Sequence, residues 1–251
     1  AEASGSQSGR LVALDGLAAT HTVRGNLPVA DSLYSELLGL QQSRFEADSL
    51  SGRVLVRTLG TLAEISLNRG LLARADSFLS RILELDASGV VDLRPEEAIL
   101  AYTVQGLGDV LAARGDSARA DSLRGRASGL KLYAQGFSYY VGDRFDRAEQ
   151  AFLGALKHQE RVLGPDHEDV ARSAHALGRL YELQGLRDKA VRHYERAVHV
   201  YARAGSARLD HAAALDDLAA ARPAGPGRID SLKRRAGTLR SEAVNPTGEI
   251  R

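Results

Sequence analysis

The chain has 251 residues, 44% of them hydrophobic and 26% charged, a composition typical of a globular protein with room for several stacked helical units. Its net charge of +1 argues against a partner held by bulk electrostatics, such as duplex DNA, so we expect no nucleic acid partner. The absence of Cys excludes disulfides, thiolate zinc sites and cysteine nucleophiles, and no apolar run approaches the roughly 18 residues of a transmembrane helix.

The amino-terminal residues 1–9 are polar and rich in Gly and Ser, and we expect them to form a flexible lead-in. The sequence contains no Met, which fits a trimmed initiator, a removed signal peptide or a piece of a longer protein. Of the 33 Lys and Arg residues 29 are Arg, which indicates a G+C-rich genome of bacterial type. The lack of Cys favours an exported or periplasmic location over a cytoplasmic one.

The motif Ala-Asp-Ser recurs at a constant interval, at Ala30, Ala75 and Ala120. Each copy has a Gly five residues before it, and Gly there favours the left-handed turn that ends a helix. A fixed period with the same turn residue indicates repeated helical hairpins. We predict three of them, over residues 10–41, 50–85 and 95–128.

A fourth hairpin comes earlier than this period requires, because Ala148 follows Ala120 more closely than Ala120 follows Ala75. We predict it over residues 130–163. Its first helix, 130–141, must be short, and we expect it to be separate from the helix over 117–128 that ends the third hairpin.

The fifth hairpin, 166–204, has a clear helical pattern. Leu177, Leu180 and Tyr181 lie at positions i, i+3 and i+4 of its first helix, which places them on one face. Asp166 is a residue type that can cap the start of this helix.

The sixth hairpin, 209–243, is Ala-rich and is interrupted by a loop rich in Pro and Gly, which we expect over 223–227. A polar, atypical end repeat is what a repeat protein needs as a cap. We expect residues 244–251 to form a tail.

The fifth hairpin resembles a tetratricopeptide repeat. That family has a Leu-Gly pair and a Tyr in the first helix, a turn Gly, and two Ala seven apart in the second; these are Leu177, Gly178, Tyr181, Gly185, Ala190 and Ala197. The preceding run, 160–171, resembles the linker of the kinesin-light-chain-like subtype. The resemblance implies an all-α fold, a right-handed α-solenoid of about six such hairpins over residues 10–243, with a concave groove lined by the first helices.

The resemblance also implies which first-helix positions face the groove. In the second and third hairpins these include Arg57, Glu64, Asn68, Tyr102, Gln105 and Asp109. Across the third to fifth hairpins we predict a partner-binding surface made of Tyr102, Tyr133, Phe137, Tyr140, Arg172, His175 and Arg179. The aromatic residues of the fourth hairpin could instead pack against the shortened neighbouring repeat, and the sequence leaves both interpretations open.

No pattern in the sequence indicates catalysis. Gly106-Leu-Gly108 lies within a predicted helix and not between a strand and a helix, which argues against a phosphate-binding loop. Asp31, Asp76 and Asp121 recur near the starts of second helices, which favours interaction with the helix dipole over acid–base chemistry. No His-x₃-His pair occurs that could hold a metal from one helix face. We therefore expect no enzyme activity, no cofactor and no metal site.

The leading hypothesis is a non-catalytic scaffold that binds a segment of a partner protein in its groove. One alternative is a permanent structural subunit of a larger bacterial complex, including a membrane-associated one. Another is a ligand-sensing regulatory module of a multidomain protein. A basic stretch over 222–240 is either the exposed face of the capping helix or a surface that docks on an acidic partner or an anionic lipid surface; it contains Arg222, Arg228, Lys233, Arg234, Arg235 and Arg240.

Overall fold

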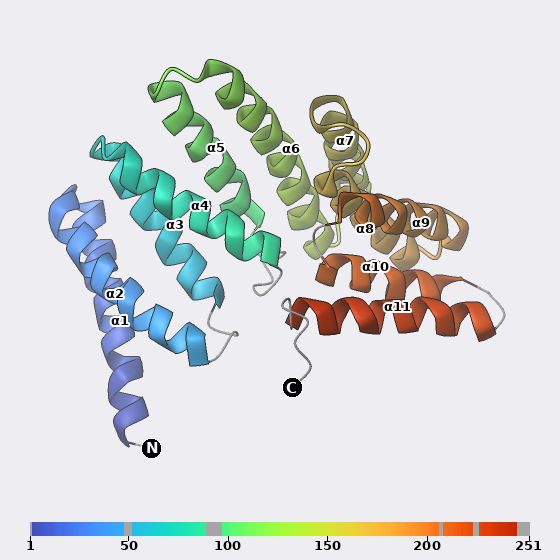
Figure 1. The fold of residues 1–251 in the computed structure, drawn as a ribbon, viewed down its shortest axis with the longest axis horizontal. Helices are drawn as coiled ribbons and strands as arrows, with labels where there is room; N and C mark the ends of the chain where they lie inside the picture. The colour runs from blue at the N-terminus through green and yellow to red at the C-terminus, as the bar shows by residue number, and fades with distance from the viewer. Residues whose placement is uncertain (1, 48–51, 89–96, 206–207, 223–225, 245–251) are drawn as a thin grey trace. The chain divides into compact units, whose positions relative to one another are not determined.

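The computed structural model describes residues 2–47, 52–88, 97–205, 208–222 and 226–244. Within these ranges the chain forms α-helices and no strand, so the predicted all-α fold of helical hairpins is confirmed (Figure 1). The helices are α1 (Glu2–Val23), α2 (Leu27–Ala47), α3 (Gly52–Asn68), α4 (Leu72–Ser88), α5 (Glu97–Ala113), α6 (Ser117–Val141), α7 (Phe145–Leu163), α8 (Glu168–Leu183), α9 (Arg187–Ala204), α10 (Arg208–Ala221) and α11 (Pro226–Val244).

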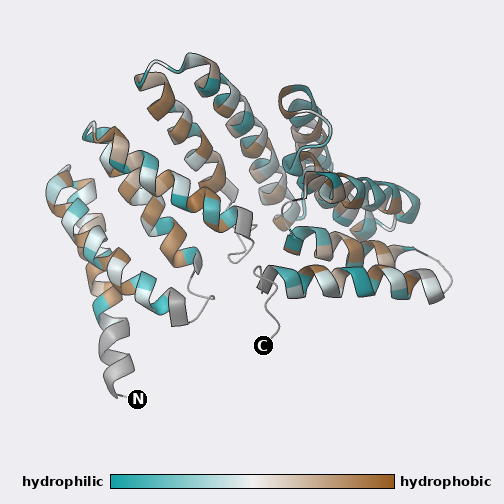
Figure 2. Ribbon diagram, viewed as in Figure 1, coloured by the Kyte–Doolittle hydropathy of each residue, from teal (hydrophilic) through white to brown (hydrophobic). Residues whose placement is uncertain are grey.

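The chain divides into two compact units. Unit 1 comprises residues 1–85 and 91–123, and unit 2 comprises residues 86–90 and 124–251, so one boundary falls within α6. Hydrophobic and hydrophilic residues alternate along the helices of each unit (Figure 2). This is the pattern of helices that bury one side against neighbours and expose the other.

The hairpin turns of unit 1 lie where the sequence period places them. Gly25, Gly70 and Gly115 follow α1, α3 and α5, and each has a positive φ between 70° and 88°. This left-handed conformation is one that residues with a Cβ rarely adopt. The second helices then present a fully buried Ala to the first, as at Ala30 and Ala75.

Adjacent hairpins of unit 1 are joined by ion pairs from the repeated aspartates. Asp31, only 5% exposed, accepts hydrogen bonds from Arg69 and, at 2.7 Å, from Arg74 Nη1 of the next hairpin. Asp76 accepts a 2.7 Å bond from Arg114 Nη1 in the same way. The first turns of α2 and α4 contain no acidic residue, so the helix-dipole role that we expected for these aspartates is wrong. They lie one turn further along and bind guanidinium groups.

The largest difference from the sequence prediction is α6. We expected two helices, 117–128 and 130–141, but the structure has one helix of 25 residues, Ser117–Val141. It follows α5 after the turn at Gly115 and precedes α7, so the same helix ends one hairpin and begins the next. This explains the shortened spacing between Ala120 and Ala148, because no separate first helix is inserted.

Gly125 and Gly129 in α6 mark close packing against α7 and do not mark a break. A Cβ at Gly125 would lie 2.7 Å from Val162 Cγ1, and a Cβ at Gly129 would lie 2.8 Å from Gln159 Cγ. Real Cβ contacts are longer, so only Gly permits this approach. The close approach explains Gly at two positions where helix propensity alone disfavours it.

Glycines also carry the aromatic core of unit 2. The ring of Phe152 in α7 lies on Gly136 in α6, and the ring of Tyr194 in α9 lies on Gly178 in α8. A Cβ on either glycine would come within 2.6 Å of a ring atom. Both rings are fully buried, at most 1% exposed.

Several ends of helices differ from the prediction. α1 begins at Glu2, so residues 2–9 continue the helix in place of the expected flexible lead-in; extending an existing helix costs far less than nucleating one. The cap of α8 is His167, whose Nδ1 accepts a 3.1 Å bond from the Asp169 backbone N–H, and not Asp166. α11 begins at Pro226, inside the expected loop, because Pro suits the first turn of a helix. The expected tail lies outside the described residues except for Val244.

Candidate binding groove between α3 and α5

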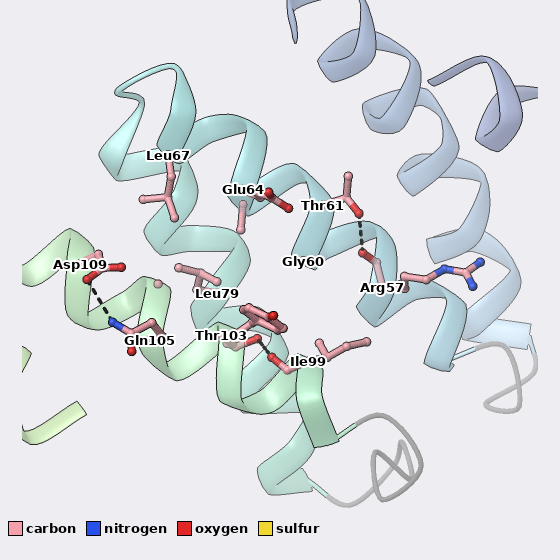
Figure 3. Close-up of a pocket in the computed structure, with 13 residues that line it drawn as sticks. Arg57, Gly60, Thr61, Glu64, Leu67, Leu79, Ile99, Thr103, Gln105 and Asp109 are labelled. Atoms are coloured by element: carbon pink, nitrogen blue, oxygen red, sulfur yellow. Dashed lines mark hydrogen bonds between the residues drawn. The ribbon is translucent and has the colours of Figure 1, made fainter. Parts of the chain in front are cut away.

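A pocket of about 480 Å³ lies in unit 1 between α3 and α5, the first helices of the second and third hairpins (Figure 3). From α3 it is lined by Arg57, Gly60, Thr61, Ala63, Glu64 and Leu67. From α5 it is lined by Ile99, Tyr102, Thr103, Gln105, Gly106 and Asp109, and α4 contributes Leu79.

α3 and α5 lie side by side and run in the same direction. A Cβ at Gly60 would lie 4.0 Å from Ile99 Cγ2, and a Cβ at Gly106 would lie 3.5 Å from Leu67 Cδ1. The two residues of each pair are separated by the same distance along the sequence, which fixes a parallel register for the two helices. The pocket is therefore a repeat-to-repeat feature of the first helices.

The floor of the pocket is apolar. Ala63 and Leu79 are buried, at 1% and 3% exposure. Gly106 is packed closely, since a Cβ there would lie 3.2 Å from Leu79 Cδ1. Gly60 is different: beyond the 4.0 Å contact to Ile99 nothing lies near its Cβ position, so the pocket opens directly beside it.

The rim of the pocket is polar and carries one exposed aromatic side chain. Tyr102 is 71% exposed. Arg57 lies at one end of the pocket, and Gln105 and Asp109 lie at the other (Figure 3). Glu64 on α3 is also exposed. Apolar floor, polar rim and aromatic edge together can hold an apolar side chain and a charged one.

The first-helix positions implied by the family resemblance coincide with this rim. Five of the six positions named for the second and third hairpins line the pocket, and the sixth, Asn68, is exposed but does not line it. The sequence reasoning missed Gly60. Gly60 could have been noticed because it lies in mid-helix, three residues after the groove position Arg57. Gly is disfavoured within a helix, so a Gly there can indicate that space beside the helix is needed.

The predicted partner-binding residues do not all share one site. Tyr102 belongs to unit 1, and the other six belong to unit 2. Of these, Arg179 is exposed and Phe137 and Tyr140 are half-buried. Their part in binding stays a prediction.

The aromatic cluster of α6 packs largely inward. Tyr133 is 5% exposed, and its ring centroid lies 5.3 Å from that of Phe152. The open, groove-facing position that we expected for Tyr133 is therefore wrong. Phe137 and Tyr140 stack at 6.1 Å on the edge of the same core, and Tyr140 meets Phe145 edge-on at 6.5 Å. These contacts are not the packing against the shortened neighbouring repeat that the sequence left open, because the rings that Tyr133 and Tyr140 meet lie in α7 of the same hairpin.

Arg172 and His175 of α8 are also buried, at 7% exposure each. We expected both to face an open groove, and this expectation is wrong. Arg172 lies 3.7 Å from Asp169 Oδ1 and 3.8 Å from Asp210 Oδ2, within unit 2. Burial alone lowers the pKa of this guanidinium, but the surrounding carboxylates raise the pKa above its ordinary value, so Arg172 stays charged. His175 Nε2 lies 2.8 Å from Asp217 Oδ2. Both side chains join elements of unit 2 to one another.

The basic stretch is partly neutralised within unit 2. Arg222 pairs with Glu195, and Arg240 pairs with Asp216. Lys233, Arg234 and Arg235 remain exposed on α11, and the side chain of Arg228 lies outside the described residues. Docking through this stretch stays a prediction.

Among the residues that the structure describes, no His, Cys, Asp and Glu side chains form a cluster suited to a metal ion. Within the same ranges, no helix is both long and apolar enough to span a membrane.

Part of the chain is similar to a known family of repeats. Residues 129–203, from the second half of α6 to α9, match the family model described as tetratricopeptide repeat. This segment is similar to that family and makes up less than a third of the chain. Such repeats generally mediate protein–protein interaction and are typically non-catalytic. No curated protein matches the chain.

Two solved structures are also similar to the chain. BtubC (BKLC) from P. vanneervenii shares 18% identity at a TM-score of 0.46, over 90% of this chain and 95% of that one. A putative kinesin light chain from Podosopora anserina, with nearly identical TPR-like repeats, shares 18% identity at a TM-score of 0.35, over 94% of this chain and 97% of that one.

Proposed function

We propose that the protein is a non-catalytic interaction scaffold that binds a segment of a partner protein in the groove between α3 and α5. The observation that carries the proposal is the pocket of about 480 Å³ between two successive first helices, with its apolar floor and exposed polar rim. The tetratricopeptide repeat in the same chain supports a protein as the partner.

The dimensions of the pocket suit one or two side chains of an extended or helical segment. Ligand pockets in proteins commonly enclose about 300–1,000 Å³. A large aromatic side chain beside such a pocket is a frequent anchor of binding energy. Tyr102, at 71% exposure, is in that position.

Gly60 offers a way to fill the pocket without disturbing the fold. Its Cβ position faces open space, so a larger side chain should enter the pocket and not the core. In mid-helix, replacing Gly with Ala or Leu should also stabilise α3 by about 0.5–1 kcal/mol. Gly60→Leu is thus the blocking variant, and Gly60→Ala is its matched control.

The experiment selects binders from a library of random twelve-residue peptides by mRNA display on the wild-type chain. Fluorescence anisotropy then gives the affinity of enriched peptides for the wild type and both Gly60 variants. We expect Gly60→Leu to weaken binding by about tenfold or more, the loss of about 1.4 kcal/mol, and Gly60→Ala to change it less than twofold. Failure to enrich any peptide, or equal binding by both variants, would reject the groove as the site.

A further inference from the structure

We infer that the pocket between α3 and α5 selects a basic side chain, Arg or Lys, flanked by an apolar residue in the partner segment. This inference rests on the proposed function and names the chemistry that the groove would recognise. It follows from the charges of the rim, the apolar floor and the position of Tyr102.

The rim carries more negative than positive charge. Glu64 is exposed on the groove side of α3, and among the described residues it has no ion pair or hydrogen bond. Asp109 on α5 is a second exposed carboxylate, and it accepts a 3.3 Å bond from Gln105 Nε2. The one cation among the described lining residues is Arg57, and it already has Asp15 Oδ2 at 3.9 Å from its Nη2. An incoming cation therefore meets the uncompensated negative charge of Glu64.

The floor and the aromatic edge match the two parts of a basic side chain. Arg and Lys bury an apolar stem while their charged head stays at the surface. Leu67, Leu79 and Ile99 supply apolar contacts for such a stem and for a neighbouring apolar residue. Tyr102 at the edge of the pocket is 71% exposed, and aromatic rings of this kind attract cations.

An acidic segment fits the same pocket less well. Its carboxylate would join Glu64 and Asp109 on one rim, and like charges brought together at an interface oppose binding. It could gain from Arg57 only at the opposite end of the pocket from Asp109 (Figure 3). Charge complementarity thus favours the basic partner.

The test uses three fluorescein-labelled nonapeptides with a Gly/Ser frame and a central Leu-X-Leu, where X is Arg, citrulline or Glu. Citrulline keeps the shape of Arg and removes its charge. At 50 mM salt we expect the Arg peptide to bind the wild type about fivefold tighter than the citrulline peptide, the size of an exposed, charge-assisted contact. The preference should shrink at 500 mM salt.

Two rim variants assign this preference to its residues. Glu64→Gln should reduce the preference for Arg over citrulline to less than about twofold and leave the citrulline peptide unaffected, because only the charge-dependent part of binding is lost. Arg57→Gln removes one charge from the same rim, so it is the matched control and should keep or increase the preference. Circular dichroism should give the same helix content for both variants.

The outcomes separate the basic-side-chain inference from the groove proposal on which it rests. Equal binding of the Arg and citrulline peptides, tighter binding of the Glu peptide, or no binding of the Arg peptide up to about 1 mM overturns the basic-side-chain inference. In those cases a different peptide can still bind the wild type. If Gly60→Leu weakens the binding of that peptide, the groove proposal stands. If the Arg peptide binds Gly60→Leu as well as the wild type, the groove proposal fails and the inference fails with it.

Discussion

The hairpin of α3 and α4 in unit 1 differs from the two hairpins of unit 2 at one repeated position, the large residue that the second helix presents to the first. In unit 2 this residue is Phe152 or Tyr194, and each ring lies on a glycine of the first helix. In unit 1 the equivalent residue of α4 is Leu79, because it also lies four residues after a buried Ala. Leu79 packs with Ala63. In its own hairpin Leu79 thus meets an Ala where the rings of unit 2 meet a glycine; the glycine close to Leu79 is Gly106 of α5, in the next hairpin.

The difference shows how one hairpin design yields either a closed core or a groove. An aromatic ring on a glycine fills the space between the helices and buries the face of the first helix. Leu79 leaves room beside it, and that room is part of the pocket whose far wall is α5. Among the hairpins compared, the pocket lies beside the one that has Leu79 in place of an aromatic ring.

The largest expected effect tests the glycine–ring contact of unit 2. Gly178→Ala places a Cβ about 2.5 Å from the Tyr194 ring, which is held by a 2.6 Å bond from its hydroxyl to Glu182 Oε2. Overpacking of this kind should lower the free energy of unfolding by about 3 kcal/mol. The measurement is urea unfolding, with hydrogen exchange by mass spectrometry to show that unit 2 carries the loss.

Gly154→Ala in α7 is the matched control. It is the same substitution within a helix of unit 2, but no atom lies within 4 Å of the added Cβ. It should raise the free energy of unfolding by about 0.5–1 kcal/mol through helix propensity. A neutral Gly178→Ala would mean that the ring does not lie on that glycine, and the contrast between the units would collapse.

The second prediction concerns the ion pairs that join the hairpins of unit 1. Asp31→Asn leaves the guanidinium groups of Arg69 and Arg74 without their shared, buried carboxylate. Hydrogen bonds to charged groups contribute about 1.5–3 kcal/mol, so we expect a loss of about 2 kcal/mol, measured by urea unfolding and confined to unit 1. Asp76→Asn removes a single pair whose side chains are 31% and 40% exposed, and should cost less than about 1 kcal/mol. Equal losses for the two variants would show that burial of Asp31 contributes nothing.

Much of the fold follows from local rules that the sequence displays. The turn at Gly70 and the buried Ala75 were predictable, because a left-handed helix end and a close helix contact each admit few residue types. The continuous helix α6 was not. We expected separate helices on either side of Gly129. The glycine instead makes room for the side chain of Gln159, which lies in the next helix and meets it only in the folded chain.

The site divides in the same way. The place of Tyr102 beside the groove followed from its position in the repeat, because α5, which carries it, lies next to the preceding first helix, α3. Tyr133, Arg172 and His175 hold equivalent positions but are buried. The partner of His175 is Asp217, 42 residues further on, and a side-chain contact of that range leaves no local signal in the sequence.

The smallest expected effect is a pH dependence of unit 2 that comes from His211 of α10. This side chain is 4% exposed, its ring stacks on Tyr201 at 6.1 Å, and its Nε2 has no hydrogen-bond partner among the described residues. Burial lowers the pKa of His211 below its ordinary value, and the nearby charge of Arg235 lowers the pKa further. The unfolded chain, with a His pKa of about 6.5, then takes up the proton more readily than the folded chain.

His211 should therefore make unit 2 less stable as the pH falls below about 6.5, and the loss should continue until the pH passes the lowered pKa of the folded state. His211→Phe keeps an aromatic ring against Tyr201 and removes the titrating group. The measurement is the urea midpoint of unit 2, detected by hydrogen exchange, at pH 7.5 and at pH 5.5. Between these two pH values the midpoint should fall more for the wild type than for His211→Phe. Comparing the two proteins at the same pH cancels the carboxylates that both share. Equal falls would mean that His211 accepts its proton in the folded state as easily as in the unfolded chain, and that burial beside Arg235 does not act on it.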